Sequence, residues 1–205
     1  MTKIKLCGLS RPRDIEAANA LQPDYIGFVF YAKSKRSVTP AQAAALKAML
    51  SPDIRVVGVF VDEAPATIAV LLRDGVIDMA QLHGHEDDAY LQSLRQLTDK
   101  PVIQAFRIAT KADCVQAELS RADFVLLDSG MGTGKAFDWE LIDRIRRPYF
   151  LAGGLDIGNV ADAVCTLHPY AVDVSSGIET DGFKDQDKMA AFVAAVRKED
   201  SSDES

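Results

Sequence analysis

The segment Tyr149–Glu179, YFLAGGLDIGNVADAVCTLHPYAVDVSSGIE, contains the unit from which the rest of the chain is built. An apolar strand ends at Gly153-Gly154, an amphipathic helix follows around residues 159–167, and a second apolar strand, 170–174, ends at Ser175-Ser176-Gly177. Two apolar strands joined by a helix predict a β–α–β unit in which the strands run parallel.

Both strand ends in this segment are small and rich in hydrogen-bond donors. Gly153 and Gly154 let main-chain N–H groups approach an anion closely, and Ser175, Ser176 and Gly177 add hydroxyl and further N–H donors. A short helix that begins just after Ser176 would direct its positive end to the same place. Either turn alone is typical of an ordinary strand–helix junction, but the two together predict a phosphate-binding site.

The same alternation of strand and helix continues along the whole chain. The predicted strands are 4–7, 25–30, 54–61, 79–82, 102–106, 124–127, 149–152 and 171–174, and the predicted helices are 14–21, 41–50, 64–73, 87–97, 112–119, 138–146, 159–167 and 184–197. Eight such units in 205 residues predict a single-domain α/β protein, a closed (β/α)₈ TIM barrel. An open doubly wound sheet is the alternative, but it normally has a glycine fingerprint where this chain has Cys7-Gly8-Leu9.

Composition is that of an ordinary soluble chain, with 48% hydrophobic and 26% charged residues. We place the catalytic barrel at residues 1–198 and expect the polar segment 199–205 to be a disordered tail. A net charge of −7 and a pI of about 5.0 argue against nucleic acid or an anionic membrane as partner. The absence of a signal core and of a membrane-spanning run predicts a cytoplasmic location. Three widely spaced cysteines predict reduced thiols.

In a barrel the functional side chains gather at the C-terminal ends of the strands. Cys7 ends the first strand, and a thiol with an ordinary pKa of about 8.5 needs only modest help from positive charge to act as a base or nucleophile. A buried structural cysteine is the alternative. Asp128 ends the sixth strand after two leucines, where desolvation would raise its pKa and suit it to donate a proton, unless it only caps the loop.

Other strand ends add further candidates. Arg36 follows the second strand, where a guanidinium can grip a carboxylate through two parallel hydrogen bonds. Gln81 and His83 alternate at the end of the fourth strand, so both should point to the barrel interior or mouth. A metal site there is weakly supported, because outside this segment the only histidine is His168. The glycine-rich segment 130–134 predicts a flap whose backbone can approach a ligand.

Seven short motifs occur in a fixed order between residues 3 and 192: KLCGL at 5–9, GFVF at 27–30 with SKR at 34–36, GVFV at 58–61, QLHG at 81–84, Asp128 with GTG at 132–134 and FDW at 137–139, AGGL at 152–155 with NV at 159–160, and DVSSGIE at 173–179. Together they resemble the phosphoribosylanthranilate isomerase family. Each motif is short, but seven in register make the resemblance specific.

The resemblance implies an isomerase of tryptophan biosynthesis that needs no cofactor and no metal. It would convert N-(5-phosphoribosyl)anthranilate to 1-(2-carboxyphenylamino)-1-deoxyribulose 5-phosphate by an Amadori rearrangement, with Asp128 as general acid and Cys7 as general base. Arg36 would hold the anthranilate carboxylate. The remaining substrate-binding residues implied are Gln81, His83, Gly153, Gly154, Asp173, Ser175, Ser176 and Gly177. Whether His83 contacts the aromatic ring or only packs is left open. The phosphosugar is the expected partner, and the chain would act as a monomer or homodimer.

The barrel fold also predicts where this acid and this base lie. We expect the first and sixth strands to face each other across the barrel mouth, with the phosphate held by strands seven and eight.

Two other functions fit the same fold. The histidine-pathway aminoaldose isomerase would have an acidic base at the first strand end and a second phosphate site after strands three and four, where this chain has Phe60-Val61-Asp62-Glu63. A catalytically silent barrel that only binds a phosphometabolite is the other, and Cys7 together with Asp128 speaks against it.

Overall fold

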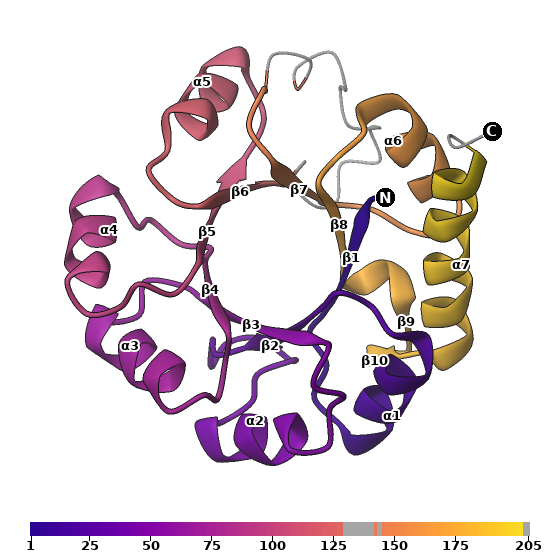
Figure 1. Ribbon diagram of the computed structural model, residues 1–205, viewed down its shortest axis with the longest axis horizontal. Coiled ribbons are helices and arrows are strands. Elements are labelled where there is room, and N and C mark those ends of the chain that lie inside the picture. Colours follow the sequence, from indigo (N-terminus) through magenta and orange to yellow (C-terminus); the bar gives the residue numbers. More distant parts are fainter. Residues whose placement is uncertain (129–141, 143–144, 203–205) are drawn as a thin grey trace.

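The computed structural model describes residues 1–128, 142 and 145–202. Its centre is a barrel of eight parallel strands hydrogen-bonded in chain order, and β1 and β8 close the ring (Figure 1). The predicted closed barrel is confirmed, and the open sheet is wrong because β1 pairs with β2 on one side and β8 on the other. The strands are β1 (Lys3–Cys7), β2 (Tyr25–Val29), β3 (Arg55–Phe60), β4 (Met79–Leu82), β5 (Val102–Arg107), β6 (Phe124–Asp128), β7 (Tyr149–Ala152) and β8 (Ala171–Val174).

Seven α-helices of the described residues surround the barrel (Figure 1). They are α1 (Pro12–Leu21), α2 (Pro40–Lys47), α3 (Pro65–Arg73), α4 (Asp88–Arg95), α5 (Lys111–Leu119), α6 (Val160–Leu167) and α7 (Gln186–Ser202). Of the helix predicted over 138–146, the structure describes only residues 142, 145 and 146, and the glycine-rich segment 130–134 lies outside the described residues. Within the part of the chain that the structure describes, no helix combines the length and the apolar character needed to cross a membrane.

Local sequence signals set the starts of several helices. The Thr39 hydroxyl accepts a hydrogen bond from the Gln42 N–H at 3.2 Å, and Pro40 supplies the first residue of α2. Asp87 caps α4 by accepting from the Tyr90 N–H at 2.9 Å. Helix α7 continues to Ser202, inside the segment where we expected a disordered tail, because good helix formers such as Glu199 extend its last turns.

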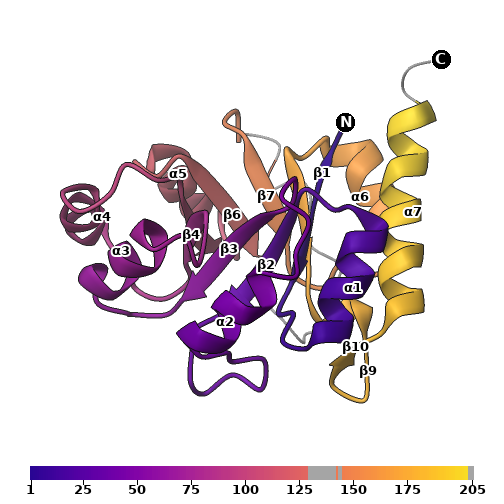
Figure 2. The same ribbon diagram turned by 60° about the horizontal axis from the view of Figure 1, so that its bottom comes forward.

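The segment after β8 differs from the prediction. A three-residue 3₁₀ turn, η2 (Ser176–Ile178), leads into a two-stranded antiparallel hairpin of β9 (Glu179–Thr180) and β10 (Phe183–Lys184). Asp181 and Gly182 form its turn with φ of 53° and 80°. The predicted helix start at residue 184 is therefore wrong, because Lys184 pairs with Glu179 in the hairpin. Figure 2 shows the hairpin and the N-terminus at opposite ends of the barrel.

Apolar side chains fill the N-terminal half of the barrel interior. Phe150 packs against Tyr25, Phe124 and Tyr170 with ring centroids 5.5–5.8 Å apart. Nearer the C-terminal ends of the strands, polar side chains replace apolar ones at Lys5, Gln81 and Asp173, all of them buried. Buried polar groups are costly unless they have partners or a task, so the change in polarity marks the functional end of the barrel.

Candidate active site

A cavity of about 230 Å³ opens at the C-terminal ends of the strands. The structure brings together in its wall both predicted catalytic residues, Cys7 and Asp128, and most of the predicted binding residues, namely Arg36, Gln81, His83, Gly153, Gly154, Asp173, Ser175 and Ser176. Gly177 is not part of the wall but follows Ser176, which is. A Cβ atom on Gly177 would be 2.1 Å from the carbonyl oxygen of Leu155, so glycine there lets the loops after β7 and β8 pack together.

Cys7 is the last residue of β1 and is 8% exposed. A Cβ atom on Gly27 of β2 would lie 2.6 Å from the Cys7 Sγ, so the glycine makes room for the thiol. Burial raises the pKa of the Cys7 thiol, while the ammonium groups of Lys5 and Lys184 act in the opposite direction. The thiol therefore faces the cavity in a buried but charged environment, which is unlike that of an inert core cysteine.

Lys5 and Asp173 form a buried ion pair beside this thiol. The two residues are partners in the β1–β8 pairing, and Lys5 Nζ lies 2.9 Å from Asp173 Oδ2. Burial alone would lower the pKa of Lys5, but the charges of Asp173 and Cys7 outweigh it and raise that pKa. The other oxygen, Asp173 Oδ1, is buried and has no hydrogen-bond partner among the described residues. It is thus free to accept a hydrogen bond from a ligand.

Sequence reasoning gave Lys5 no role. The signal that could have found it is its position two residues before Cys7 on the same strand, because such residues point to the same face.

Gln81, His83 and Asp128 form a second polar group on the cavity wall. Gln81 Nε2 lies 2.9 Å from His83 Nδ1, and His83 Nε2 lies 3.5 Å from Asp128 Oδ2. Gln81 and His83 therefore point the same way, as the strand alternation predicted. With Gln81 donating to Nδ1, a neutral imidazole carries its proton on Nε2 and directs it to Asp128. Gln81 Oε1 is a second buried acceptor with no partner in the described parts of the chain.

Arg36 already holds a carboxylate of its own chain. Its Nε and Nη2 donate to Glu179 Oε1 and Oε2 at 2.6 and 2.7 Å. Lys184 Nζ donates to Glu179 Oε1 at 2.6 Å and to the carbonyl oxygen of Ser175 at 2.8 Å. Burial alone would raise the pKa of Glu179, but hydrogen bonds from Arg36 and Lys184 outweigh it and lower that pKa.

Sequence analysis missed Glu179 and Lys184 as residues of the site. The dipeptide Asp181-Gly182 is a strong hairpin signal, and reading it would have placed these two side chains opposite each other.

The two predicted phosphate loops lie side by side on the cavity. Gly153 and Gly154 have φ of 87° and 66°, a conformation that glycine adopts without strain. The Ser175 hydroxyl donates to the Cys7 carbonyl oxygen at 3.1 Å, which ties the second loop to β1. The predicted helix after Ser176 is only the three-residue turn η2, so main-chain N–H groups, and no helix dipole, are what this loop can offer an anion.

The relative position of Cys7 and Asp128 differs from the expected one. In a closed ring of eight strands β5 lies opposite β1, and only β7 and β8 separate β6 from β1. The expectation that the first and sixth strands face each other across the mouth is therefore wrong. Cys7 and Asp128 instead flank the two glycine–serine loops, which lie between them.

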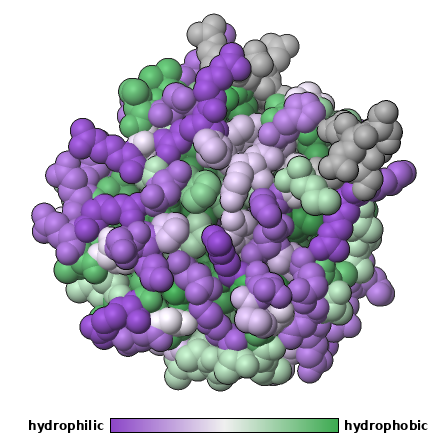
Figure 3. Space-filling view, in the orientation of Figure 1, coloured by the Kyte–Doolittle hydropathy of each residue, from purple (hydrophilic) through white to green (hydrophobic). Residues whose placement is uncertain are grey.

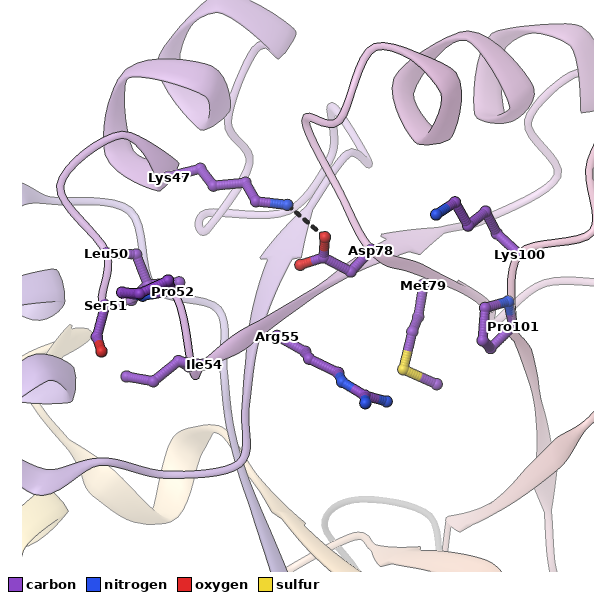
Figure 4. A pocket seen from close by; sticks show the side chains of 10 residues that line it. All are labelled: Lys47, Leu50, Ser51, Pro52, Ile54, Arg55, Asp78, Met79, Lys100 and Pro101. Atoms are coloured by element: carbon purple, nitrogen blue, oxygen red, sulfur yellow. Dashed lines mark hydrogen bonds and ion pairs between the residues drawn. The ribbon is translucent and has the colours of Figure 1, made fainter.

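A second hollow, of about 610 Å³, lies at the N-terminal ends of β3, β4 and β5 (Figure 4). There Lys47 Nζ and Asp78 Oδ1 are 2.6 Å apart, and Asp78 Oδ2 accepts from the Val56 N–H at 2.7 Å, so these residues tie α2 to two strands. Residues at this end of a barrel serve stability, and catalytic groups gather at the other end. We therefore assign the chemistry to the smaller cavity.

Within residues 1–128, 142 and 145–202, no group of three or more His, Cys, Asp or Glu side chains could hold a metal ion.

Comparison with known proteins gives a consistent result. The model of the family described as N-(5'phosphoribosyl)anthranilate (PRA) isomerase matches residues 4–195. A curated relative from Endomicrobium trichonymphae, named N-(5'-phosphoribosyl)anthranilate isomerase, is 43% identical over 202 residues, which cover 96% of this chain and 99% of the relative.

Solved structures agree with this. The phosphoribosyl anthranilate isomerase of Thermotoga maritima has a TM-score of 0.90 at 35% identity and covers 97% of this chain and 100% of its own. A structure of such an isomerase in complex with reduced 1-(o-carboxyphenylamino)-1-deoxyribulose 5-phosphate has a TM-score of 0.86 at 34% identity, with the same coverage.

Proposed function

Because the family model spans residues 4–195, the chain belongs to the N-(5'-phosphoribosyl)anthranilate isomerase family, and we propose from this premise that Cys7 and Asp128 carry its acid–base chemistry. The enzyme isomerises N-(5'-phosphoribosyl)anthranilate to 1-(2-carboxyphenylamino)-1-deoxyribulose 5-phosphate, an Amadori rearrangement in tryptophan biosynthesis. One observation carries the assignment of roles: both side chains line the cavity whose remaining wall contains the glycine–serine loops after β7 and β8.

Asp128 acts first, as general acid. It protonates the furanose ring oxygen, the bond between that oxygen and C1 breaks, and the lone pair of the anilino nitrogen forms an iminium. His83 supports this step, because its Nε2 lies 3.5 Å from Asp128 Oδ2 and can donate a hydrogen bond to the carboxylate that remains after the proton has left.

Cys7 acts second, as general base. Its thiolate removes the C2 proton, and the electron pair of that C–H bond moves toward the iminium to give an enolamine, which tautomerises to the ketone. The acid has lost one proton and the base has gained one, as an isomerisation requires. The iminium acidifies the C2 proton, so a thiolate of moderate basicity is sufficient, and the Lys5 ammonium stabilises that thiolate in the buried site.

The binding groups hold the two ends of the substrate. Main-chain N–H groups of Gly154, Ser175, Ser176 and Gly177, adjoined by Gly153, bind the phosphate, and Arg36 binds the anthranilate carboxylate. Asp173 Oδ1 and Gln81 Oε1, the two buried acceptors without partners in the described residues, accept hydrogen bonds from ribose hydroxyl groups. Binding energy from the phosphate, which does not react, orients the sugar between acid and base.

The wider setting is proposed on the same basis. The phosphosugar is the partner, no cofactor takes part, and the enzyme acts in the cytoplasm as a monomer or homodimer. The histidine-pathway and silent-barrel alternatives are set aside, because the chain belongs to a different isomerase family and retains both catalytic groups.

The test is turnover by substituted enzymes, followed as the change in fluorescence when substrate is generated in solution. Cys7→Ala and Asp128→Asn should each lower kcat by at least about 100-fold, because each removes a proton-transfer group. Cys165→Ala, which removes an exposed thiol outside the cavity, is the matched control and should keep parental turnover. Circular dichroism checks that each variant is folded. A rate within a few-fold of the parent in either active-site variant would contradict the assignment.

A further inference from the structure

The hairpin β9–β10 lies beside the active site but has no part in the reaction as written above. A two-stranded hairpin is barely stable alone, and here its neighbours fix it. Arg11 Nη2 donates to the Lys184 carbonyl oxygen at 2.8 Å, and Lys188 Nζ donates to the Glu179 carbonyl oxygen at 2.8 Å. The Arg11 guanidinium also lies 4.8 Å from the centre of the Phe183 ring. The hairpin is thus anchored to Arg11 at the start of α1 and to Lys188 in α7.

The anchored hairpin carries two charged side chains into the site. Glu179 and Lys184 are cross-strand partners, and their side chains are only 9% and 2% exposed. Burying a cation lowers its tendency to stay charged, and burial lowers the pKa of Lys184 in this way. Burying these two charges costs desolvation free energy, and well-packed apolar residues of the same size often stabilise a protein more. Stability alone is therefore a poor explanation of this ion pair.

The ion pair to Arg36 uses only one edge of the guanidinium. Nε and Nη2 face Glu179, while Nη1 has no acceptor among the described residues. The stem of the side chain rests on Gly8, where a Cβ atom would lie 2.5 Å from Arg36 Cδ. Glu179 thus holds the guanidinium at its inner edge, Nε with Nη2, and Gly8 makes room for the stem of the side chain. The outer edge, Nη1 with Nη2, keeps the geometry that binds a carboxylate through two hydrogen bonds.

We propose that Glu179 is a positioning residue for Arg36, and that Lys184 is a positioning residue for Glu179, so that the outer edge of the guanidinium is set in advance to receive the substrate carboxylate. This inference rests on the proposed function, because it requires Arg36 to bind that carboxylate. Arg36 comes from the loop between β2 and α2. A long side chain that is mobile in the free enzyme loses conformational entropy when it binds a ligand. Because Glu179 fixes the Arg36 side chain before the substrate arrives, that loss of entropy is removed from the binding step.

The test separates binding from chemistry. Glu179→Gln should raise KM by roughly tenfold and leave kcat within about threefold, because the reacting groups are untouched. Lys184→Met should raise KM in the same way, and only its KM is compared, because the Lys184 ammonium also acts on Cys7. Thr180→Val is the matched control on the same hairpin, since it removes the 2.7 Å hydrogen bond to Asp185 without touching Arg36. It should leave KM unchanged.

A double-substitution cycle decides whether Glu179 acts through Arg36. In an Arg36→Ala enzyme, adding Glu179→Gln should raise KM by less than about twofold further, because the group that Glu179 positions is gone. Equal effects of Glu179→Gln with and without Arg36 would overturn the inference, and so would an unchanged KM in the folded Glu179→Gln enzyme. This cycle decides the question even where Lys184→Met does not fold. Failure of the proposed function looks different, because Cys7→Ala or Asp128→Asn would then turn over at close to the parental rate, or Arg36→Ala alone would leave KM unchanged.

Discussion

The charges nearest Cys7 do not cancel. The charged cluster beside the thiol, buried except for the partly exposed Arg36, contains three cations and two carboxylates, namely Lys5, Arg36, Lys184, Asp173 and Glu179. One positive charge is therefore left over, and a thiolate at Cys7 would neutralise it. Burial opposes that thiolate by raising the pKa of Cys7, so the nearby cations decide how much of the thiol is ionised.

Substituting either member of the Lys5–Asp173 pair should shift the titration of Cys7 in opposite directions. Lys5 lowers the pKa of Cys7 and Asp173 raises it, so Lys5→Met should raise that pKa and Asp173→Asn should lower it. The measurement is the pH dependence of alkylation by iodoacetamide in a background where Cys114 and Cys165 are alanine. Misfolding would shift the pKa of Cys7 in the same direction in both variants. Two shifts of the same sign would therefore contradict this account.

At the same scale, part of the site could be predicted from the sequence and part could not. Cys7, Asp128 and the two glycine–serine turns stand at strand ends, where the fold itself places function, so local pattern was enough to select them. The partner of Arg36 could not be selected in this way. Glu179 lies far from Arg36 in the chain and meets it only because β8 closes the barrel against β1.

Among the elements, the eight strands were predictable because each is a continuous apolar run bounded by helical segments. The hairpin was not, because β9 and β10 have two residues each and show no periodicity. The loops after β7 and β8 depend on each other in a way that the sequence does not show. Their contact is so close that Gly177 leaves no space for a side chain toward Leu155.

Gly177→Ala should therefore damage both stability and phosphate binding. Its Cβ would lie 2.1 Å from the Leu155 carbonyl oxygen, which is backbone and cannot rotate away, so the loops must separate. We expect a loss of about 1–3 kcal/mol in unfolding free energy, measured by urea denaturation, and a raised KM.

Gly158→Ala is the control for this loop pair. Its Cβ would meet only the Asp156 side chain, at 3.2 Å, and that side chain can move. Equal stability of the Gly177→Ala and Gly158→Ala proteins would show that the contact between the loops is dispensable.

For the whole molecule, the barrel and its helices bury two tyrosines, Tyr25 and Tyr149. On the face shown in Figure 3, hydrophilic side chains predominate and hydrophobic ones are interspersed among them. Inside, Tyr149 donates its hydroxyl hydrogen to the Leu167 carbonyl oxygen at 2.8 Å, and burial raises the pKa of Tyr149 to about 12. The folded protein thus resists an ionisation that the unfolded chain undergoes near pH 10.

The stability of the barrel should therefore fall with rising pH between about 10 and 12. Above pH 10 an unfolded Tyr149 loses its proton and the folded one does not, so the stability that the neutral form contributes is complete below pH 10 and is lost as pH rises toward 12. Urea unfolding at pH 8, 10 and 11 measures this. Tyr149→Phe should make the decline shallower, and an identical decline in both proteins would rule out Tyr149 as its cause.

The aromatic packing of Tyr25, Phe124, Phe150 and Tyr170 has a kinetic consequence. It blocks the barrel axis below the reacting groups, so a molecule cannot leave by the far end. Among the described residues, the cavity at the C-terminal ends of the strands is then the route for both substrate and product. The product keeps the phosphate and the carboxylate to which we propose that the site binds. Before it is released, the product therefore occupies the site that the next substrate molecule must enter. The product should act as a competitive inhibitor of its own formation.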